Sequence, residues 1–304
     1  MRKIFIYIVA MLMPLAASAQ ALPFVAADYS ASALAKAGAN ATETSSTAFS
    51  SFENIAAVPF SEKAADFAVG YTMWQPSSVP SNVIAAAGSY NVGDKLGFAF
   101  GLTHGSYKAY DIFNDNGSNK GTFKPSDFQL KLGAAYRLMQ YLSAGVSLGY
   151  ASSSLSEEVS YGAFDVDIYL MSKLEDFKVA LGVSDLGSAV TSATGAKFSL
   201  PSAVTLGLGY EKGFADVHKV DVGLDADYYF AGALATSVGA EYTFDEMVSV
   251  SAGYRYGGKS VIPSYASLGL GCSFVGVSLD FAYILPVAKS PMGKTISLAV
   301  GYSF

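Results

Sequence analysis

Apolar residues alternate with small or polar residues along most of this chain. The segment Ile296–Phe304 is the clearest case, because five apolar side chains alternate there with Ser, Ala and Gly. Successive side chains of a β-strand point to opposite faces, so this alternation predicts a strand with one apolar face. That face consists of Ile296, Leu298, Val300, Tyr302 and Phe304. Equivalent segments recur from about residue 64, and a weaker one at 83–92 brings the predicted number of strands to fourteen.

The connections between these segments alternate between short and long. Short turns are predicted near 91–95, 139–141, 173–176, 245–247 and 275–276. Longer connections are predicted near 75–81, 105–126, 152–161, 187–200, 258–264 and 286–293. Outer-membrane barrels have short periplasmic turns and long external loops, and an even strand count leaves both chain ends in the periplasm. Two connections fit less well, because 211–217 is long for a turn and 231–233 is short for a loop.

The face opposite the apolar one distinguishes a membrane barrel from a soluble β-sandwich. A sandwich turns its apolar face inward and a polar face toward water. Here the second face is dominated by Gly, Ser, Ala and Thr, while Tyr and Phe gather toward the strand ends. This distribution is typical of a barrel between lipid and a hydrated lumen. The sequence therefore predicts an all-β fold, a 14-stranded antiparallel transmembrane β-barrel of the Gram-negative outer membrane, formed by residues 62–304.

The first residues of the chain predict export. Arg2 and Lys3 precede the apolar stretch Ile4–Leu15, and Ala17–Ala19 has the small residues of a cleavage site. We therefore expect residues 1–19 to be a cleaved Sec signal peptide. A membrane anchor is disfavoured, because a helix that spans a bilayer needs roughly 18 or more apolar residues.

Residues 20–61 do not show the alternation of the predicted wall. Many of them are small, and a polar stretch follows at Thr42–Thr47. A barrel of this strand number is wide enough to leave lumen space that wall side chains do not fill. The segment either folds into the lumen as a plug or hangs in the periplasm. We favour an N-terminal plug, because small side chains permit a close approach to the wall.

Composition narrows the classes of function. The formal net charge of −6 becomes −8 without Arg2 and Lys3, with 17 basic against 25 acidic residues. Nucleic-acid binding relies on basic patches, so no nucleic-acid partner is expected. Cys272 is the single cysteine, which excludes an intrachain disulfide. It shares the parity of Leu268 and Leu270, so we expect it to face lipid.

The same alternation places eleven charged residues on the predicted lumen face. They are Lys131, Arg137, Lys178 and Arg255, with Asp165, Asp167, Asp221, Asp225, Asp227, Glu241 and Asp280. These charges form either an ion-pair network that holds the plug or a path for a ligand or ion, and we favour the network. Asp221, Asp225 and Asp227 share one strand face, but three carboxylates without a turn to converge them are weak evidence for calcium. No metal or cofactor site is predicted.

Enzyme chemistry finds little support in the sequence. His104 and His218 are the only histidines, and neither has a metal-ligand spacing to another His or Cys. Ser106 follows His104 by two residues, which permits a Ser–His contact, but an interfacial histidine is the simpler interpretation. Trp74 is likewise interpreted as an interfacial anchor. No catalytic residue is predicted, and we expect a protein that is not an enzyme.

The connection 105–126 is the largest predicted loop and a candidate surface for a protein partner. Its aromatic side chains lie among Asp and Asn residues. They are Tyr107, Tyr110, Phe113 and Phe123.

Several stretches resemble the PorV/PorQ family of Bacteroidota outer-membrane proteins. Phe198–Tyr210 resembles the family's "sLPxxxxLGxxY" strand. Leu181–Gly187 is similar to its "LGxxxxNLG" stretch, with Asp185 in place of the usual Asn. Ala37–Ala41 and Asn54–Ala56 resemble the "GGAxxA…NPA" opening, without the Pro after Asn54.

The resemblance implies a FadL-like barrel and offers two kinds of function. Family members include a component that hands on cargo in type IX secretion. FadL moves fatty acids through a lateral opening in the wall, with an N-terminal hatch that controls passage. Many outer-membrane barrels end on an aromatic residue and present this last strand to their assembly machinery. The chain resembles them in ending on Phe304.

Two functional hypotheses follow. The first is a docking or accessory subunit of an envelope protein secretion (type IX-like) or outer-membrane assembly complex, with a protein partner. The alternative is a FadL-type channel for uptake of a hydrophobic small molecule. Ligand sites are mostly apolar, whereas the predicted lumen face carries Gly, Ser and Asp, so we favour the docking subunit. In both hypotheses, outer-membrane lipid surrounds the barrel.

Overall fold

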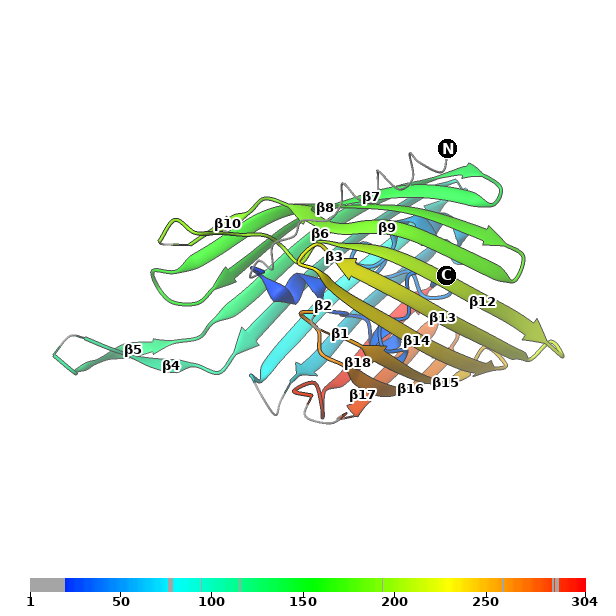
Figure 1. The fold of residues 1–304 in the computed structure, drawn as a ribbon. Coiled ribbons are helices and arrows are strands. Elements are labelled where there is room, and N and C mark those ends of the chain that lie inside the picture. Colours follow the sequence, from blue (N-terminus) through cyan, green and yellow to red (C-terminus); the bar gives the residue numbers. More distant parts are fainter. Residues whose placement is uncertain are drawn as a thin grey trace.

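The computed structural model describes residues 20–304 apart from 76–78, 94, 115, 193, 259, 286, 288 and 289. The signal peptide predicted at 1–19 therefore lies outside the described residues. Over the described part, the strands form one closed antiparallel barrel (Figure 1). The N-terminal segment, blue in Figure 1, lies inside this barrel.

Fourteen strands close the barrel, which confirms the predicted fold class. The first strand, β1, pairs with the last, β18, in a register that runs from Asp66 opposite Ser303 to Met73 opposite Ile296. The barrel strands are β1 (Ala65–Trp74), β2 (Ser81–Val92), β3 (Leu96–Tyr107), β6 (Ser126–Met139), β7 (Leu142–Ser154), β8 (Ser160–Leu174), β9 (Phe177–Gly187), β12 (Ala203–Phe214), β13 (His218–Tyr229), β14 (Ala233–Phe244), β15 (Val248–Tyr256), β16 (Tyr265–Phe274), β17 (Val277–Leu285) and β18 (Ile296–Ser303).

The two ends of the barrel differ in their connections. At the turn end the connections are tight, and turn residues such as Glu175 and Val275 adopt positive φ of 52° and 50°. At the loop end the connections are mostly longer, and two of them carry hairpins that project at the left of Figure 1. These hairpins are β4 (Tyr110–Phe113) with β5 (Asn119–Phe123), and β10 (Val190–Thr191) with β11 (Lys197–Phe198).

Two connections, near 211–217 and 231–233, fitted the predicted alternation poorly, and they differ in the structure. The β12–β13 connection is a tight turn, because β12 extends to Phe214 and β13 begins at His218. Positive φ at Ala215 and Asp216, 51° and 61°, lets the chain reverse within this short distance. The connection between β13 and β14 is short although it lies at the loop end.

The outward face of the barrel carries the apolar side chains that the alternation assigns to it. In β18, about half of the surface of Leu298, Val300 and Tyr302 is exposed, and Phe304 is exposed beside them. Ile296 is partly exposed at the start of the strand, and Cys272 is exposed on β16. An exposed apolar band around a closed sheet is the surface that outer-membrane barrels present to lipid.

The N-terminal segment forms three short helical turns within the lumen. They are η1 (Pro23–Ala26), α2 (Ala31–Ala35) and η2 (Ile55–Phe60). The Ser30 side chain accepts a hydrogen bond from Ala33 N at 3.3 Å and caps α2, and Asn54 caps η2 through Ala56 N at 3.0 Å. No helix in the described part of the chain is long and apolar enough to cross a membrane.

Glycines on the lumen face let the wall and the N-terminal segment approach closely. A Cβ atom on Gly253 would lie 2.5 Å from Lys36 O, and one on Gly133 would lie 2.8 Å from the Ile55 side chain. Gly253 meets backbone atoms and therefore requires glycine, whereas a side chain at position 133 would force the Ile55 side chain to shift. The other glycines in this contact are Gly97, Gly101, Gly145, Gly207, Gly209, Gly223, Gly239 and Gly269. The small residues of the lumen face therefore make room for the segment.

Candidate functional site

The cavity at the loop end is named here the outer pocket. It has a volume of about 240 Å³ and lies between the start of the N-terminal segment and the loop-end residues of β1, β2, β3 and β6. The β15–β16 connection completes its wall. The apolar side chains that line it are Phe24, Trp74, Val79, Val83, Val261 and Ile262.

The polar groups of the outer pocket are mainly hydroxyls and carboxylates. Tyr107 OH donates a hydrogen bond to Asp127 Oδ2 at 2.5 Å, and Tyr29 OH donates to Phe24 O at 2.6 Å. Asp28 also lines the pocket, but its carboxylate lies on the side of Arg255 in the cavity described next. No Lys, Arg or His occurs among the described residues that line this pocket. The outer pocket is therefore apolar with an acidic group at its wall and lacks a described cation.

Strand register brings Tyr107 and Asp127 together. Asp127 on β6 is paired with Gly105 on β3, and Tyr107 lies two residues beyond Gly105 on the same face. Only 6% of Asp127 is exposed. The carboxylate is thus held at the pocket wall by backbone pairing and by one tyrosine hydrogen bond.

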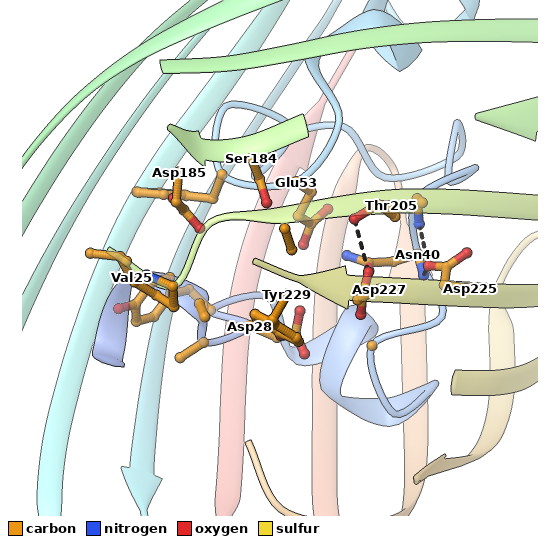
Figure 2. Close-up of a pocket in the computed structure, with 18 of the residues that line it drawn as sticks. Val25, Asp28, Asn40, Glu53, Ser184, Asp185, Thr205, Asp225, Asp227 and Tyr229 are labelled. Carbon is orange, nitrogen blue, oxygen red and sulfur yellow. Dashed lines mark hydrogen bonds between the residues drawn. The ribbon is translucent and has the colours of Figure 1, made fainter. Parts of the chain in front are cut away.

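Below the outer pocket lies a smaller cavity of about 90 Å³, named here the inner chamber. Figure 2 shows its lining between the N-terminal segment and strands of the barrel wall. Ala27, Asp28 and Tyr29 line both cavities, so this short stretch separates them. The charged residues around the chamber are Asp28, Glu53, Asp185, Asp225, Asp227 and Arg255.

Hydrogen bonds tie the inner chamber to the N-terminal segment. Asp225 Oδ2 accepts from the backbone N–H groups of Asn40 and Ala41, each at 2.8 Å. Asp227 accepts from the Thr205 hydroxyl at 2.8 Å and from Arg255 Nη2 at 3.1 Å. Figure 2 marks contacts of both carboxylates with dashed lines. The chamber is thus a polar junction between the N-terminal segment and the wall.

Two carboxyls that the N-terminal segment contributes to the chamber have raised pKa values. Burial raises the pKa of Asp28 to about 6, although the nearby Arg255 opposes this shift. Burial raises the pKa of Glu53 to about 8, and the neighbouring carboxylates of Asp28 and Glu43 add to the shift. Burial disfavours the charged form of a carboxyl, so Glu53 is mainly neutral at neutral pH.

Next to the chamber, one lysine lies among three buried carboxylates. Lys131 Nζ lies 2.5 Å from Asp167 Oδ2, 2.9 Å from Asp185 Oδ1 and 3.1 Å from Asp165 Oδ1. A register shift between β8 and β9, with a φ of 54° at Asp185, positions the third carboxylate. The three acidic groups lie close enough to one another to hold a metal ion. The Lys131 ammonium supplies the positive charge at this place in the structure.

A second ionic network connects the N-terminal segment to the wall. Lys36 pairs with Glu43 of the same segment and lies 3.4 Å from Asp221 Oδ1 of β13. Lys178 contacts Asp221 Oδ2 at 2.9 Å and Glu211 Oε2 at 3.0 Å.

Other predicted lumen charges lie nearer the turn end. The Arg137 guanidinium lies 4.6 Å from the centre of the Phe60 ring of η2. Glu241 and Asp280 line a polar cavity of about 610 Å³ at the turn end. Ser251 Oγ donates a hydrogen bond to Glu241 Oε2 at 2.8 Å. All eleven predicted lumen charges thus lie on the inner side of the wall, divided among several clusters.

The structure does not bring Asp221, Asp225 and Asp227 together as one ion site. Asp221 contacts Lys36 and Lys178, whereas Asp225 accepts backbone N–H groups and Asp227 pairs with Arg255. In the described part of the chain, the group of three carboxylates within ligating distance is instead Asp165, Asp167 and Asp185.

The predicted partner loop divides into an inward residue and an outward hairpin. Tyr107 belongs to β3 and lines the outer pocket. Tyr110 and Phe113 are exposed on β4, and the Tyr110 ring packs on Phe123 with 5.9 Å between ring centres. Of the four aromatic residues predicted to form the partner surface, Tyr107 is therefore the one that lines the outer pocket.

Several residues of the outer pocket were not predicted to face the lumen, although strand parity indicates this orientation for two of them. Trp74 has the parity opposite to the apolar Met73, which places it inward, and the structure puts it in the pocket rather than on the outer surface. Asp127 has the same parity as Lys131 and belongs with the lumen charges. Phe24, Tyr29 and Val261 lie outside alternating segments, so periodicity gave no signal for them.

Comparisons with known proteins find solved structures of the same fold. No protein-family model and no curated protein matches this chain. The solved toluene transporter TodX of Pseudomonas putida matches with a TM-score of 0.64 and 14% identity, over 90% of this chain and 97% of that one. The toluene transporter TbuX of Ralstonia pickettii matches with a TM-score of 0.61 and 12% identity, over 89% and 96%. A FadL homologue of Pseudomonas aeruginosa has a TM-score of 0.53 and 13% identity, over 90% and 97%. The fold is that of FadL-type outer-membrane barrels.

These comparisons correct the functional hypothesis favoured from the sequence. The docking-subunit hypothesis is wrong, because the structural neighbours are transporters and hydrocarbon channels and fit the alternative instead. The resemblance to PorV/PorQ proteins is supported only in its coarser part, the FadL-like barrel. The premise that the lumen lacks an apolar pocket also fails. The N-terminal segment and the loops supply apolar lining together with two wall residues, Trp74 and Val83.

Proposed function

We propose that this chain is a channel of the outer membrane that takes up a hydrophobic small molecule. The outer pocket is the observation that carries the proposal. It is a largely apolar cavity with a few placed polar groups, as ligand sites usually are. Its volume of about 240 Å³ exceeds the roughly 150 Å³ of an apolar cavity that binds benzene. The toluene transported by two structural neighbours is a molecule of this size class.

The rest of the chain has roles that fit this function. Residues 1–19 direct export, residues 20–61 act as the plug, and residues 62–304 form the barrel in outer-membrane lipid. The strand ending at Phe304 is presented to the outer-membrane assembly machinery. Within the FadL-like barrels, the motif at Phe198–Tyr210 favours the PorV/PorQ branch. The protein works without catalysis, and its partner is the transported molecule.

Uptake by whole cells tests the proposal. The measurement is the initial uptake rate of radiolabelled toluene by a Gram-negative host with and without this chain. We expect faster uptake with the chain present, because the outer membrane itself slows apolar molecules. Val83→Trp should return the rate to that of the host, because a larger side chain fills the outer pocket. Ile84→Trp is the matched control, because Ile84 follows on the same strand and faces outward.

Two results would count against the proposal. The first is equal uptake with and without the chain, although heat-dependent electrophoretic mobility shows a folded barrel in the outer membrane. The second is an uptake rate equal to that of the wild type in a folded Val83→Trp variant. This result would show that the transported molecule does not pass through the outer pocket.

A further inference from the structure

The outer pocket combines an apolar wall with polar groups of one kind. Asp127 supplies a carboxylate at its wall, and no described lining residue of the pocket carries a positive charge. The Asp28 carboxylate lies on the side of Arg255 in the inner chamber. We propose that the outer pocket selects single-ring aromatic molecules that carry a hydrogen-bond donor, and that it rejects carboxylates. This inference rests on the proposed function and names its class of substrate.

Asp127 is the acceptor that a donor group would reach. Its carboxylate is held in place by the hydrogen bond from Tyr107 OH to Oδ2 at 2.5 Å. A carboxylate offers about four acceptor positions, so the hydroxyls of Tyr107 and Ser153 leave about two of them open. Hydrogen bonds to a charged acceptor are stronger than neutral ones, and the buried position of Asp127 limits competition from water. A hydroxyl or amino group on a ligand therefore gains from this site.

Several donors around the outer pocket are already engaged. Tyr107 OH donates to Asp127, and Tyr29 OH donates to Phe24 O at 2.6 Å. Gln75 Nε2 lies 3.0 Å from Met292 Sδ and donates to it. A carboxylate ligand would therefore compete with existing hydrogen bonds for these donors.

Charge acts against an anion at two successive cavities. In the outer pocket, a carboxylate ligand would face Asp127 without a described cation in the lining. Like charges repel more strongly where water is partly excluded. Past the stretch Ala27–Tyr29, the inner chamber adds further carboxylates, with Arg255 as its lining cation among the described residues. Both cavities therefore favour neutral or cationic molecules.

The lining also indicates a ring rather than a long chain. Four aromatic side chains surround the pocket, and aromatic pairs gain from offset or edge-on contacts. They are Phe24, Tyr29, Trp74 and Tyr107. A volume of about 240 Å³ accommodates a substituted ring, since a cavity of roughly 150 Å³ already binds benzene.

Three molecules of matched shape test the inference. They are toluene, p-cresol and 4-methylbenzoate, which share a methyl-substituted ring and differ in having no polar group, a donor or an anion. Binding to the purified full chain in detergent is followed by tryptophan fluorescence, because Trp74 is the only tryptophan and lines the pocket. Calorimetry provides the second readout. We expect p-cresol to bind about tenfold more tightly than toluene, and 4-methylbenzoate to bind most weakly.

Variants assign the preference to Asp127. Asp127→Asn should lower the ratio of p-cresol to toluene affinity, both measured on the same variant, about tenfold. Asp111→Asn is the matched control, because Asp111 is exposed on β4 and lies outside the pocket lining. Tyr107→Phe keeps the ring and frees the Asp127 carboxylate, so p-cresol should bind at least as tightly as in the wild type. This variant keeps the test informative if Asp127→Asn does not fold.

The outcomes separate the inference from the proposed function. Equal binding of toluene and p-cresol would overturn the donor preference and leave the channel proposal standing. Tightest binding of 4-methylbenzoate would overturn the rejection of carboxylates. Loss of p-cresol binding in a folded Tyr107→Phe variant would show that the tyrosine, not Asp127, is the contact. Binding of none of the three molecules would count against the channel proposal itself.

Discussion

The outer pocket and the inner chamber lie on either side of one short stretch of chain, yet their chemistry is opposite. The outer pocket is lined mainly by apolar and aromatic side chains, whereas the inner chamber is surrounded by carboxylates and Arg255. The wall strands contribute to both cavities. Trp74 and Val83 line the outer pocket, whereas Asp225, Asp227 and Arg255 line the inner chamber. The N-terminal segment adds to this difference, because it presents Phe24 to one cavity and Glu53 to the other.

This difference teaches that the wall of a barrel does not define the character of its lumen. A strand wall with mainly glycine and serine inside is compatible with an apolar pocket, provided that a few large wall side chains and another segment supply the apolar surface. The lumen glycines permit this arrangement, because they let the segment lie against the backbone of the wall.

The largest effect is expected from Lys131→Met beside the inner chamber. The substitution leaves Asp165, Asp167 and Asp185 close together without the ammonium that lies among them. Removing one partner of a buried ion pair costs about 3–5 kcal/mol. We expect the free energy of unfolding, measured by urea titration of the barrel in lipid or detergent, to fall by that amount.

An exposed pair provides the control for this loss. Lys120 lies 3.4 Å from Glu157, and both side chains are about half exposed. Lys120→Met should change the free energy of unfolding by less than about 1 kcal/mol, because surface ion pairs contribute little. Equal effects of the two substitutions would show that burial of the Lys131 cluster has no energetic consequence.

A smaller effect is expected when the N-terminal segment is pushed away from the wall. Gly253→Leu places a side chain where a Cβ atom would already lie 2.5 Å from Lys36 O. Overpacking of this kind costs about 1–3 kcal/mol, and displacement of the segment should raise ion conductance across planar bilayers.

Gly213→Leu is the matched control for conductance. A Cβ atom there would lie 3.8 Å from His218 O, which is ordinary contact. A Gly253→Leu barrel that conducts no more than the Gly213→Leu barrel would contradict the role of the glycine contact in seating the segment.

The raised pKa of Glu53 predicts a dependence of stability on pH. Because the folded pKa of about 8 lies above the ordinary value, the folded state binds more protons than the unfolded state between these values. Stability should therefore fall as the pH rises from about 5 to about 8, by about 1–2 kcal/mol, a discounted fraction of the full shift. Urea titrations at several pH values measure this slope.

The variant Glu53→Gln separates this group from other titrating residues. It removes the titration and keeps a side chain of similar shape, so its stability should vary less with pH than that of the wild type. The lost part of the slope belongs to Glu53. An unchanged slope would refute the assignment, and a steeper slope would mean that the carboxyl is charged in the folded chamber at neutral pH.

The sequence predicted the wall well because strand alternation is a local property. Each face of Ile296–Phe304 is specified by residues two apart, and the face toward lipid requires an apolar side chain at every second position. Inward charges such as Lys131 and Asp225 followed from the same parity. The strand count and the alternation of turns and loops then followed from repetition.

The cavities could not be predicted in this way, because they depend on contacts between distant segments. Val261 meets Phe24 and Trp74 in the outer pocket only after the barrel has closed and the N-terminal segment has entered it. Asp185 reaches Lys131 through a local register shift that alternation does not encode. Strand parity alone does predict that Trp74 and Asp127 point inward. These two residues are the part of the pocket that the local sequence pattern can predict.

The smallest effect is expected from the outward hairpin of the loop end. Replacing 111–122 with a short Gly-Ser linker removes most of β4 and β5, which pair with each other and not with the barrel sheet. Tyr107 remains on β3 and keeps its place beside Asp127. We expect the free energy of unfolding to change by less than about 0.5 kcal/mol, as for surface changes in general, and the preference for p-cresol over toluene to persist. Loss of that preference in a stable shortened barrel would show that the hairpin helps to form the outer pocket, and the comparison with the inner chamber would then extend to the external loop.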